Sequence, residues 1–190
     1  MIYTQNKKAN VAIHKTLIKC KNIILSNCSP KAILLAGSYA RGEGMVTQRQ
    51  GKLNFISDID IYIFGNRGVK HKLKKINEII KQIKIIDINI QYMDTHYQHD
   101  DLSAVDLKYQ TKLLYGEPVH KSISINEKRA LKTAIRFLMS KSKYLLLIGK
   151  GTTKEETIDL CSRAYAEIAT VLCCKAGIYK ITYLERCNTI

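Results

Sequence analysis

The first half of the chain alternates between strand-like and helix-like patterns of apolar residues. The segment SDIDIYIF at 57–64 alternates residue by residue, so its three isoleucines fall on one face of a strand, opposite Asp58 and Asp60. The segment KIIDINIQYM at 84–93 alternates in the same way, and its polar face begins at Asp87. Both patterns predict strands with one apolar face and an acidic start to the other.

Helices and turns are predicted around these strands. Apolar residues at helical spacing predict a helix over 5–27, which the Ser-Pro pair at 29–30 ends. A second helix is predicted after the glycines at 65–68, with its apolar positions between 69 and 83. The remaining predictions are a short buried strand at 32–37, a helix or turn at 38–43, and a loop or small hairpin at 44–56.

The chain after residue 100 has mainly helical spacing. One helix is predicted over 101–114, with Gly116 as its C-cap, and an extended crossing follows at 117–119. Longer helices are predicted over 126–148 and 154–175, while the tail 177–190 is left open. Strands and helices together predict an α/β (α+β) fold, in which a small mixed sheet flanked by helices precedes a helical extension.

Composition narrows the class of protein. The chain has 190 residues, of which 46% are hydrophobic, and no run of about 18 apolar residues that could span a membrane. Its N-terminus lacks the apolar core of a signal peptide, and its six cysteines show no zinc-site or disulfide-framework spacing. We therefore expect a cytoplasmic protein with reduced thiols and no membrane partner.

The net charge of +15 is open to two interpretations. It is typical of a protein with a polyanionic partner such as RNA, DNA or a nucleotide. It also reflects a lysine-rich composition, because only seven of the 31 basic residues are arginine, the better bidentate phosphate ligand. Charge alone therefore decides nothing.

The strongest chemical signal is the set of three carboxylates Asp58, Asp60 and Asp87. If their two strands pair, they converge at one edge of the sheet, because neighbouring strands are only about 4.8 Å apart. Like charges this close repel each other, and a hard dication such as Mg²⁺ would compensate them. A solvated strand end is the plain alternative for a single D-x-D pair.

A second signal precedes the acids. The apolar segment LLAG runs into Gly37 and Ser38, where a strand-to-helix turn would expose backbone N–H groups and a hydroxyl. Such turns bind phosphate, although a glycine turn with a serine N-cap is also common in ordinary α/β proteins.

Taken together, the motifs resemble the nucleotidyltransferase superfamily that includes DNA polymerase β, the aminoglycoside nucleotidyltransferases and the small MNT-type proteins. The resemblance lies in the order LLAGS, ARGE, SDIDIYIF, IIDINIQY and LLYGEPVH, over roughly residues 30–120. It implies a catalytic domain at 1–120, which includes the N-terminal helix, and a helical C-terminal extension at 121–190.

The resemblance also implies roles for individual residues. Gly37 and Ser38 would hold the β- and γ-phosphates of a nucleoside triphosphate, and Arg41 would assist them unless it is simply a surface arginine. Two Mg²⁺ ions, or Mn²⁺ in their place, would be held by the acids Asp58, Asp60 and Asp87. Asp87 would also help deprotonate the attacking hydroxyl. We expect Glu43 to be structural, paired with Arg41 or capping.

The chain departs from the family pattern in one place. Nineteen residues separate Ser38 from Asp58, more than in many members. The surplus predicts an inserted hairpin within 44–56 that reshapes the acceptor pocket.

The predicted reaction is transfer of a nucleoside monophosphate from an NTP to a hydroxyl group, with release of pyrophosphate. The acceptor is predicted to be a small molecule or a protein, with an RNA 3′ end as the alternative. Two other classes stay open: a non-catalytic nucleotide- or RNA-binding module on the same fold, and a helical interaction protein in which the D-x-D is incidental. Base preference and oligomeric state are not predicted.

Overall fold

The computed structural model describes residues 2–83, 85–94, 102–145, 153–179 and 182–189. The chain forms two compact units, one of residues 1–97 and 110–122 and the other of residues 98–109 and 123–190. The domains expected from the sequence are 1–120 and 121–190, whereas the units change over at 122/123 and the second unit also includes residues 98–109. Each unit is described by itself.

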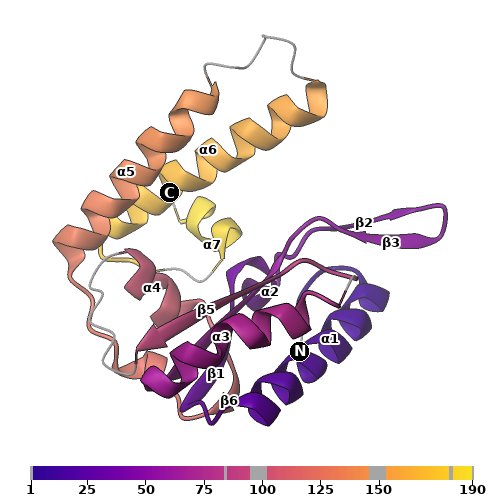
Figure 1. Cartoon of the computed structure of the whole chain (residues 1–190). Helices are drawn as coiled ribbons and strands as arrows, with labels where there is room; N and C mark the ends of the chain where they lie inside the picture. Colours follow the sequence, from indigo (N-terminus) through magenta and orange to yellow (C-terminus); the bar gives the residue numbers. More distant parts are fainter. Residues whose placement is uncertain (1, 84, 95–101, 146–152, 180–181, 190) are drawn as a thin grey trace. The chain divides into compact units, whose positions relative to one another are not determined.

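The first unit is built on a four-stranded mixed sheet with the order β5-β4-β1-β6 (Figure 1). Strand β4 runs antiparallel to β1 and parallel to β5, and β1 also pairs antiparallel with β6. This arrangement confirms the predicted α/β class. The strands are β1 (Ala32–Ala36), β4 (Ile59–Gly65), β5 (Ile88–Asp94) and β6 (Lys112–Gly116).

Two helices contribute to the core on one face of this sheet. Helix α1 (Lys7–Asn27) is preceded by the N-cap Asn6, and helix α3 (Arg67–Ile80) by the N-cap Asn66. In both, the asparagine side chain accepts a backbone N–H of the first turn. They share one apolar core with the isoleucines of β4 and β5. Ile59, Ile61 and Ile63 are fully buried there, which confirms the apolar strand face predicted by alternation.

A short helix and a hairpin connect β1 to β4. Helix α2 (Gly37–Arg41) follows β1 directly, and strands β2 (Val46–Arg49) and β3 (Lys52–Phe55) pair as an antiparallel hairpin, as predicted for 44–56. The partly buried side chains of Val46, Leu53 and Phe55 pack against the main core. The insertion is therefore an ordered hairpin with its base fixed to the first unit.

The second unit is helical. It contains α4 (Leu102–Tyr109), α5 (Glu127–Leu145), α6 (Lys154–Lys175) and α7 (Tyr183–Cys187). A small core of Val105, Ala130, Ala134 and Cys174 joins α4, α5 and α6. Helix α7 accounts for part of the tail that the sequence left open, and Thr182 and Glu185 form a capping box at its start.

The helix predicted over 101–114 is wrong in its second half. Helix α4 ends at Tyr109, and Lys112–Gly116 forms β6 instead. The segment pairs with the open side of β1, and Gly116, which was predicted to be a helix C-cap, ends this strand. A side chain at Gly116, where φ is 83°, would overlap the Lys31 carbonyl, so the site requires glycine. Pairing with a strand about 80 residues away overrode the local helical spacing.

The segment after β6 is helical, and the lengths of the described helices bear on membrane insertion. A short 3₁₀ helix (Val119–Ser122) follows β6, where only an extended crossing was predicted. None of the helices within the described ranges is long and apolar enough to cross a membrane.

Candidate nucleotidyl-transfer site

The predicted site residues gather where β1 ends and where β4 and β5 begin. Because β1 and β4 are antiparallel, the end of β1 lies beside the start of β4, with Ala36 opposite Asp60. Because β4 and β5 are parallel, their starts also lie together, with Asp60 opposite Asn89. Strand topology alone therefore brings three distant segments of sequence to one end of the sheet.

Asp58 and Asp87 each stand one residue before the first pair of the β4–β5 ladder, which joins Ile59 to Ile88. The backbone N–H of Ile59 donates to the carbonyl of Asp87 at 2.8 Å, which fixes this register. Both aspartate side chains are exposed. The structure thus places these two predicted acids next to each other across neighbouring strands.

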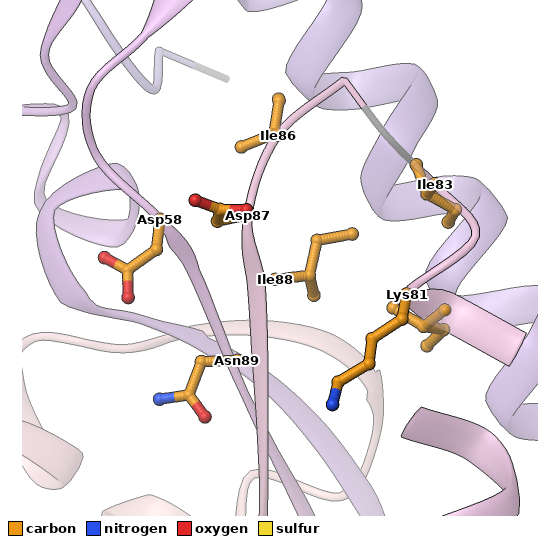
Figure 2. Close-up of a pocket in the computed structure, with 8 residues that line it drawn as sticks. Asp58, Lys81, Ile83, Ile86, Asp87, Ile88 and Asn89 are labelled. Carbon is orange, nitrogen blue, oxygen red and sulfur yellow. The ribbon is translucent and has the colours of Figure 1, made fainter. Parts of the chain in front are cut away.

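A cavity of about 220 Å³ lies at the start of β5. Figure 2 shows the side chains of Asp58, Asp87 and Asn89 on one side of the β5 backbone, while those of Lys81 and Ile88 lie on the other. The rest of the wall is apolar: Ile80, Ile83 and Ile86. The cavity thus combines carboxylates and an amide with an isoleucine wall.

Asp60 lies in an environment that perturbs its carboxyl group. It is partly buried, and this burial is the main cause that raises the pKa of its carboxyl, followed by repulsion from Asp58. The Asn89 side chain opposes this by donating to Asp60 Oδ1 at 3.1 Å, and the positive charge of Arg41 acts in the same direction. The negative charge of this pair is therefore only partly compensated within the protein.

Gly37 contacts Asp60 directly. It has a φ of 67°, and a Cβ atom at this position would overlap the Asp60 carboxylate. Position 37 therefore requires glycine for two reasons: the positive φ disfavours other residues, and Asp60 leaves no room for a side chain. Ser38 follows and is partly exposed, and its carbonyl accepts the N–H of Glu43 at 2.9 Å. The predicted glycine–serine turn and the predicted acids thus form one continuous site.

Arg41 is held by two side chains. Its Nε donates to Glu43 at 2.7 Å, the pairing expected for Glu43, and its Nη1 donates to Gln110 Oε1 at 3.3 Å. The Arg41 side chain is only 13% exposed, so it is not an ordinary surface arginine. Its orientation is fixed before any ligand arrives, which lowers the entropic cost of using it.

Tyr39 lies beneath the site and is fully buried. Burial, with a smaller effect of the nearby Asp58 carboxylate, raises the pKa of Tyr39 to about 12. Its hydroxyl has no hydrogen-bond partner among the described residues. The ring also fills the space beside Gly44, where a Cβ atom would overlap it. Tyr39 therefore supports the α2 turn by packing rather than by hydrogen bonding.

The hairpin is attached next to the acids. The Ser57 hydroxyl accepts the backbone N–H of Met45 at 2.9 Å, and the N–H of Ile56 donates to the Met45 carbonyl at 3.0 Å. These bonds close the hairpin one residue before Asp58. The insertion therefore leaves the acids on the sheet.

Sequence reasoning missed three residues of this site: Lys81, Asn89 and Gln110. Asn89 had a usable signal, because it follows Asp87 by two residues and so shares its strand face. Lys81 and Gln110 had none, since Gln110 reaches Arg41 across 69 residues of sequence. Asp94, which the sequence also offers as a third acid in place of Asp87, lies at the far end of β5. His96, His99 and Asp100, which suggest a metal site by residue type but are more simply loop residues after the strand, fall outside the described residues.

Within the described ranges, no three His, Cys, Asp or Glu side chains form a ready-made metal cluster. Asp58, Asp60 and Asp87 share one end of the sheet without closing around a common point. Neither a family model nor a curated protein matches the chain.

Proposed function

We propose that this chain is a Mg²⁺-dependent nucleotidyltransferase that transfers a nucleoside monophosphate from an NTP to an acceptor hydroxyl. The observation that supports this most is the register of the sheet. It aligns Asp58 with Asp87 and sets Asp60 against the Gly37–Ser38 turn. An incidental D-x-D at a strand end would have no reason to meet a phosphate-type turn.

The donor set fits a hard dication. All three acids offer carboxylate oxygens, and the pKa of Asp60 is raised first by burial and then by repulsion from Asp58, a repulsion that a bound cation would relieve. Mg²⁺ usually binds one or two carboxylates and completes its coordination with water and substrate phosphates, so an open arrangement is suitable. Asp58, Asp60 and Asp87 would hold the metal, which would neutralise charge on the reacting phosphates.

The protein's own groups have separate tasks in this reaction. The Gly37–Ser38 turn and Arg41 bind the β- and γ-phosphates, and Asp87 lies open to the acceptor. The acceptor oxygen forms a bond to the α-phosphorus as the bond to the β-phosphate oxygen breaks, and pyrophosphate leaves. Asp87 accepts the hydroxyl proton or directs it to water. Catalysis of this kind rests on positioning and charge stabilisation.

The acceptor class is proposed more broadly. The acceptor hydroxyl belongs to a small molecule or to a protein, and the base of the hairpin, which is attached one residue before Asp58, contributes to its binding surface. The RNA 3′ end is the alternative acceptor, and the exposed basic surface of helix α3 favours it.

The direct test incubates the protein with Mg²⁺, each α-labelled NTP and fractions of a cell extract, and measures pyrophosphate together with labelled product. We expect one fraction to support labelling by the native protein. The double variant Asp58→Asn/Asp60→Asn should lose it by roughly 1,000-fold or more, about 4 kcal/mol of activation free energy. Asp94→Asn, at the far end of β5, is the matched control and should keep full activity.

Two results would contradict the proposal. Turnover that survives in the double variant would show that these acids hold no catalytic metal. Nucleotide binding without turnover in any fraction would instead favour a non-catalytic module, and the absence of any response to Mg²⁺ would favour an incidental D-x-D.

A further inference from the structure

Helix α3 has an exposed basic surface with a defined direction. It contains Arg67 and four lysines but only one acid, Glu78, and Lys81 follows as its C-cap. The side chains of these basic residues are exposed, and none of the described acids forms an ion pair with them at the 4 Å limit.

Three of the lysines form one stripe. Lys70, Lys74 and Lys81 share a flank of α3 with Asn77, at spacings of four, three and four residues, so they follow one line along the helix. Lys70 and Lys74 are one turn apart, about 6 Å along the axis, and Lys81 is about 10 Å further. Glu78 lies beside this line rather than on it.

The stripe follows the edge of the sheet. The Lys70 ammonium lies 5.9 Å from the centre of the Tyr92 ring in β5, which is the edge strand of the described sheet. Lys72, on the other flank of α3, instead acts on Cys28 next to α1, where its charge lowers the pKa of that thiol against the larger effect of burial. The flank with Lys70, Lys74 and Lys81 is therefore the one that faces β5.

The stripe also ends beside the start of β5, across the β5 backbone from the acids. Helix α3 connects the end of β4 to the start of the parallel strand β5, so it runs back toward the end of the sheet where both strands begin. Lys81, at the end of α3, lines the same cavity as Asp58 and Asp87 (Figure 2). A polyanion that follows the stripe and passes around the start of the edge strand β5 would bring its terminus to the proposed site of chemistry.

We propose that Lys70, Lys74 and Lys81 bind successive phosphates of a single-stranded RNA and deliver its 3′ hydroxyl to the acids. This inference rests on the proposed function and narrows the acceptor class within it. Charge complementarity favours a polyanion. Exposed amides of Asn89 and Gln91 on the β5 edge can both donate to and accept from a ribose 2′ hydroxyl, which favours RNA over DNA.

The test measures binding without NTP, so it does not depend on catalysis. A fluorescent single-stranded RNA of roughly ten nucleotides is titrated by anisotropy at several salt concentrations, with a DNA of the same sequence as the second arm. The triple variant Lys70→Gln/Lys74→Gln/Lys81→Gln should bind roughly 10- to 100-fold more weakly at low salt. Its log–log salt slope should be shallower by about 2, at about 0.7 per lost phosphate contact.

The matched control removes the same charge elsewhere. Lys15→Gln/Lys72→Gln/Lys75→Gln replaces three exposed lysines of α1 and α3 that lie outside the stripe. It should retain most of the affinity and most of the slope. Equal losses in the two triple variants, a flat salt response of the native protein, or DNA bound as tightly as RNA would each overturn the proposal.

Failure of the proposed function would give a different result. Asp58→Asn/Asp60→Asn should keep or increase the RNA affinity, because it removes negative charge at the end of the stripe. If this variant and the native protein bind RNA through the stripe but neither labels its 3′ end, the RNA surface stands and RNA is not the acceptor. If the native protein labels a small molecule or a protein while RNA binding is absent, the stripe proposal fails and the reaction class stands.

Discussion

The two faces of the β4–β5 pair share one backbone ladder and have opposite surroundings. On the core face, Ile59 and Ile61 are fully buried under the helices. On the acid face, Asp58 and Asp87 are exposed, and Asp60 is partly buried beside Asn89. The isoleucines set the register by their burial, and the same register aligns the acids. Core packing is therefore what positions the candidate chemistry.

The largest effect is expected on the core face. Ile61→Ala should reduce the free energy of unfolding by about 2–5 kcal/mol, because it leaves a cavity in a fully buried strand. Chemical denaturation measures the change. Ile85→Ala, at a site that is 64% exposed, is the control and should change stability by less than about 0.5 kcal/mol. Similar effects at both positions would mean that β4 does not have the buried face described above.

The next effect concerns the contact between the turn and the acid face. Gly37→Ala should cost about 1–3 kcal/mol of stability and most of the activity, because its Cβ would displace the Asp60 carboxylate. Gly51→Ala in the hairpin turn shares a positive φ but has open space around it. This control should show the backbone strain alone, with activity retained. Full activity in Gly37→Ala would show that the Gly37–Ser38 turn takes no part in the reaction.

A smaller effect is expected from the hydrogen bond between Asn89 and Asp60, which opposes the repulsion between Asp58 and Asp60. Asn89→Leu removes the donor that stabilises the Asp60 carboxylate, so the pKa of this already raised group should rise further. The acidic limb of the activity profile should then move to higher pH. Activity should fall several-fold in mildly acidic buffer and little in alkaline buffer. An unchanged limb would show that Asp60 does not control it.

The smallest effect is expected beneath the site. Tyr39→Phe removes a buried hydroxyl that has no partner among the described residues, and it keeps the ring that fills the space beside Gly44. Stability should be unchanged or higher by up to about 1 kcal/mol. A thermal melt in the absence of ligand checks this. A clear loss of stability would show that the hydroxyl is bonded in solution.

The alternation of residues could be predicted from sequence because it is a local property. The isoleucines at 59, 61 and 63 identify β4, and the same period assigns Asp58 and Asp60 to the other face. Pairing of β6 with β1 could not be predicted, because local spacing at 101–114 favoured a helix and the partner strand lies about 80 residues earlier. The contact between Arg41 and Gln110 could not be predicted either, because the two residues lie 69 positions apart in the sequence.

The raised pKa of Asp60 also makes the stability of the fold depend on pH. Its pKa in the folded protein is raised above 3.8, so the folded state favours the protonated carboxyl. The stability that this group contributes is present at low pH and is lost as the pH rises from the unfolded value through the folded one. At neutral pH the charge of Asp60 therefore opposes folding.

The central claim is that Asp58, Asp60 and Asp87 together gather divalent cations around a nucleotide. The most direct measurement is anomalous diffraction from crystals grown with Mn²⁺ and a non-hydrolysable NTP. We predict Mn²⁺ bound to oxygens of all three aspartates, with the β- and γ-phosphates against Gly37 and Ser38. A bound nucleotide whose Mn²⁺ contacts none of these carboxylates would contradict it.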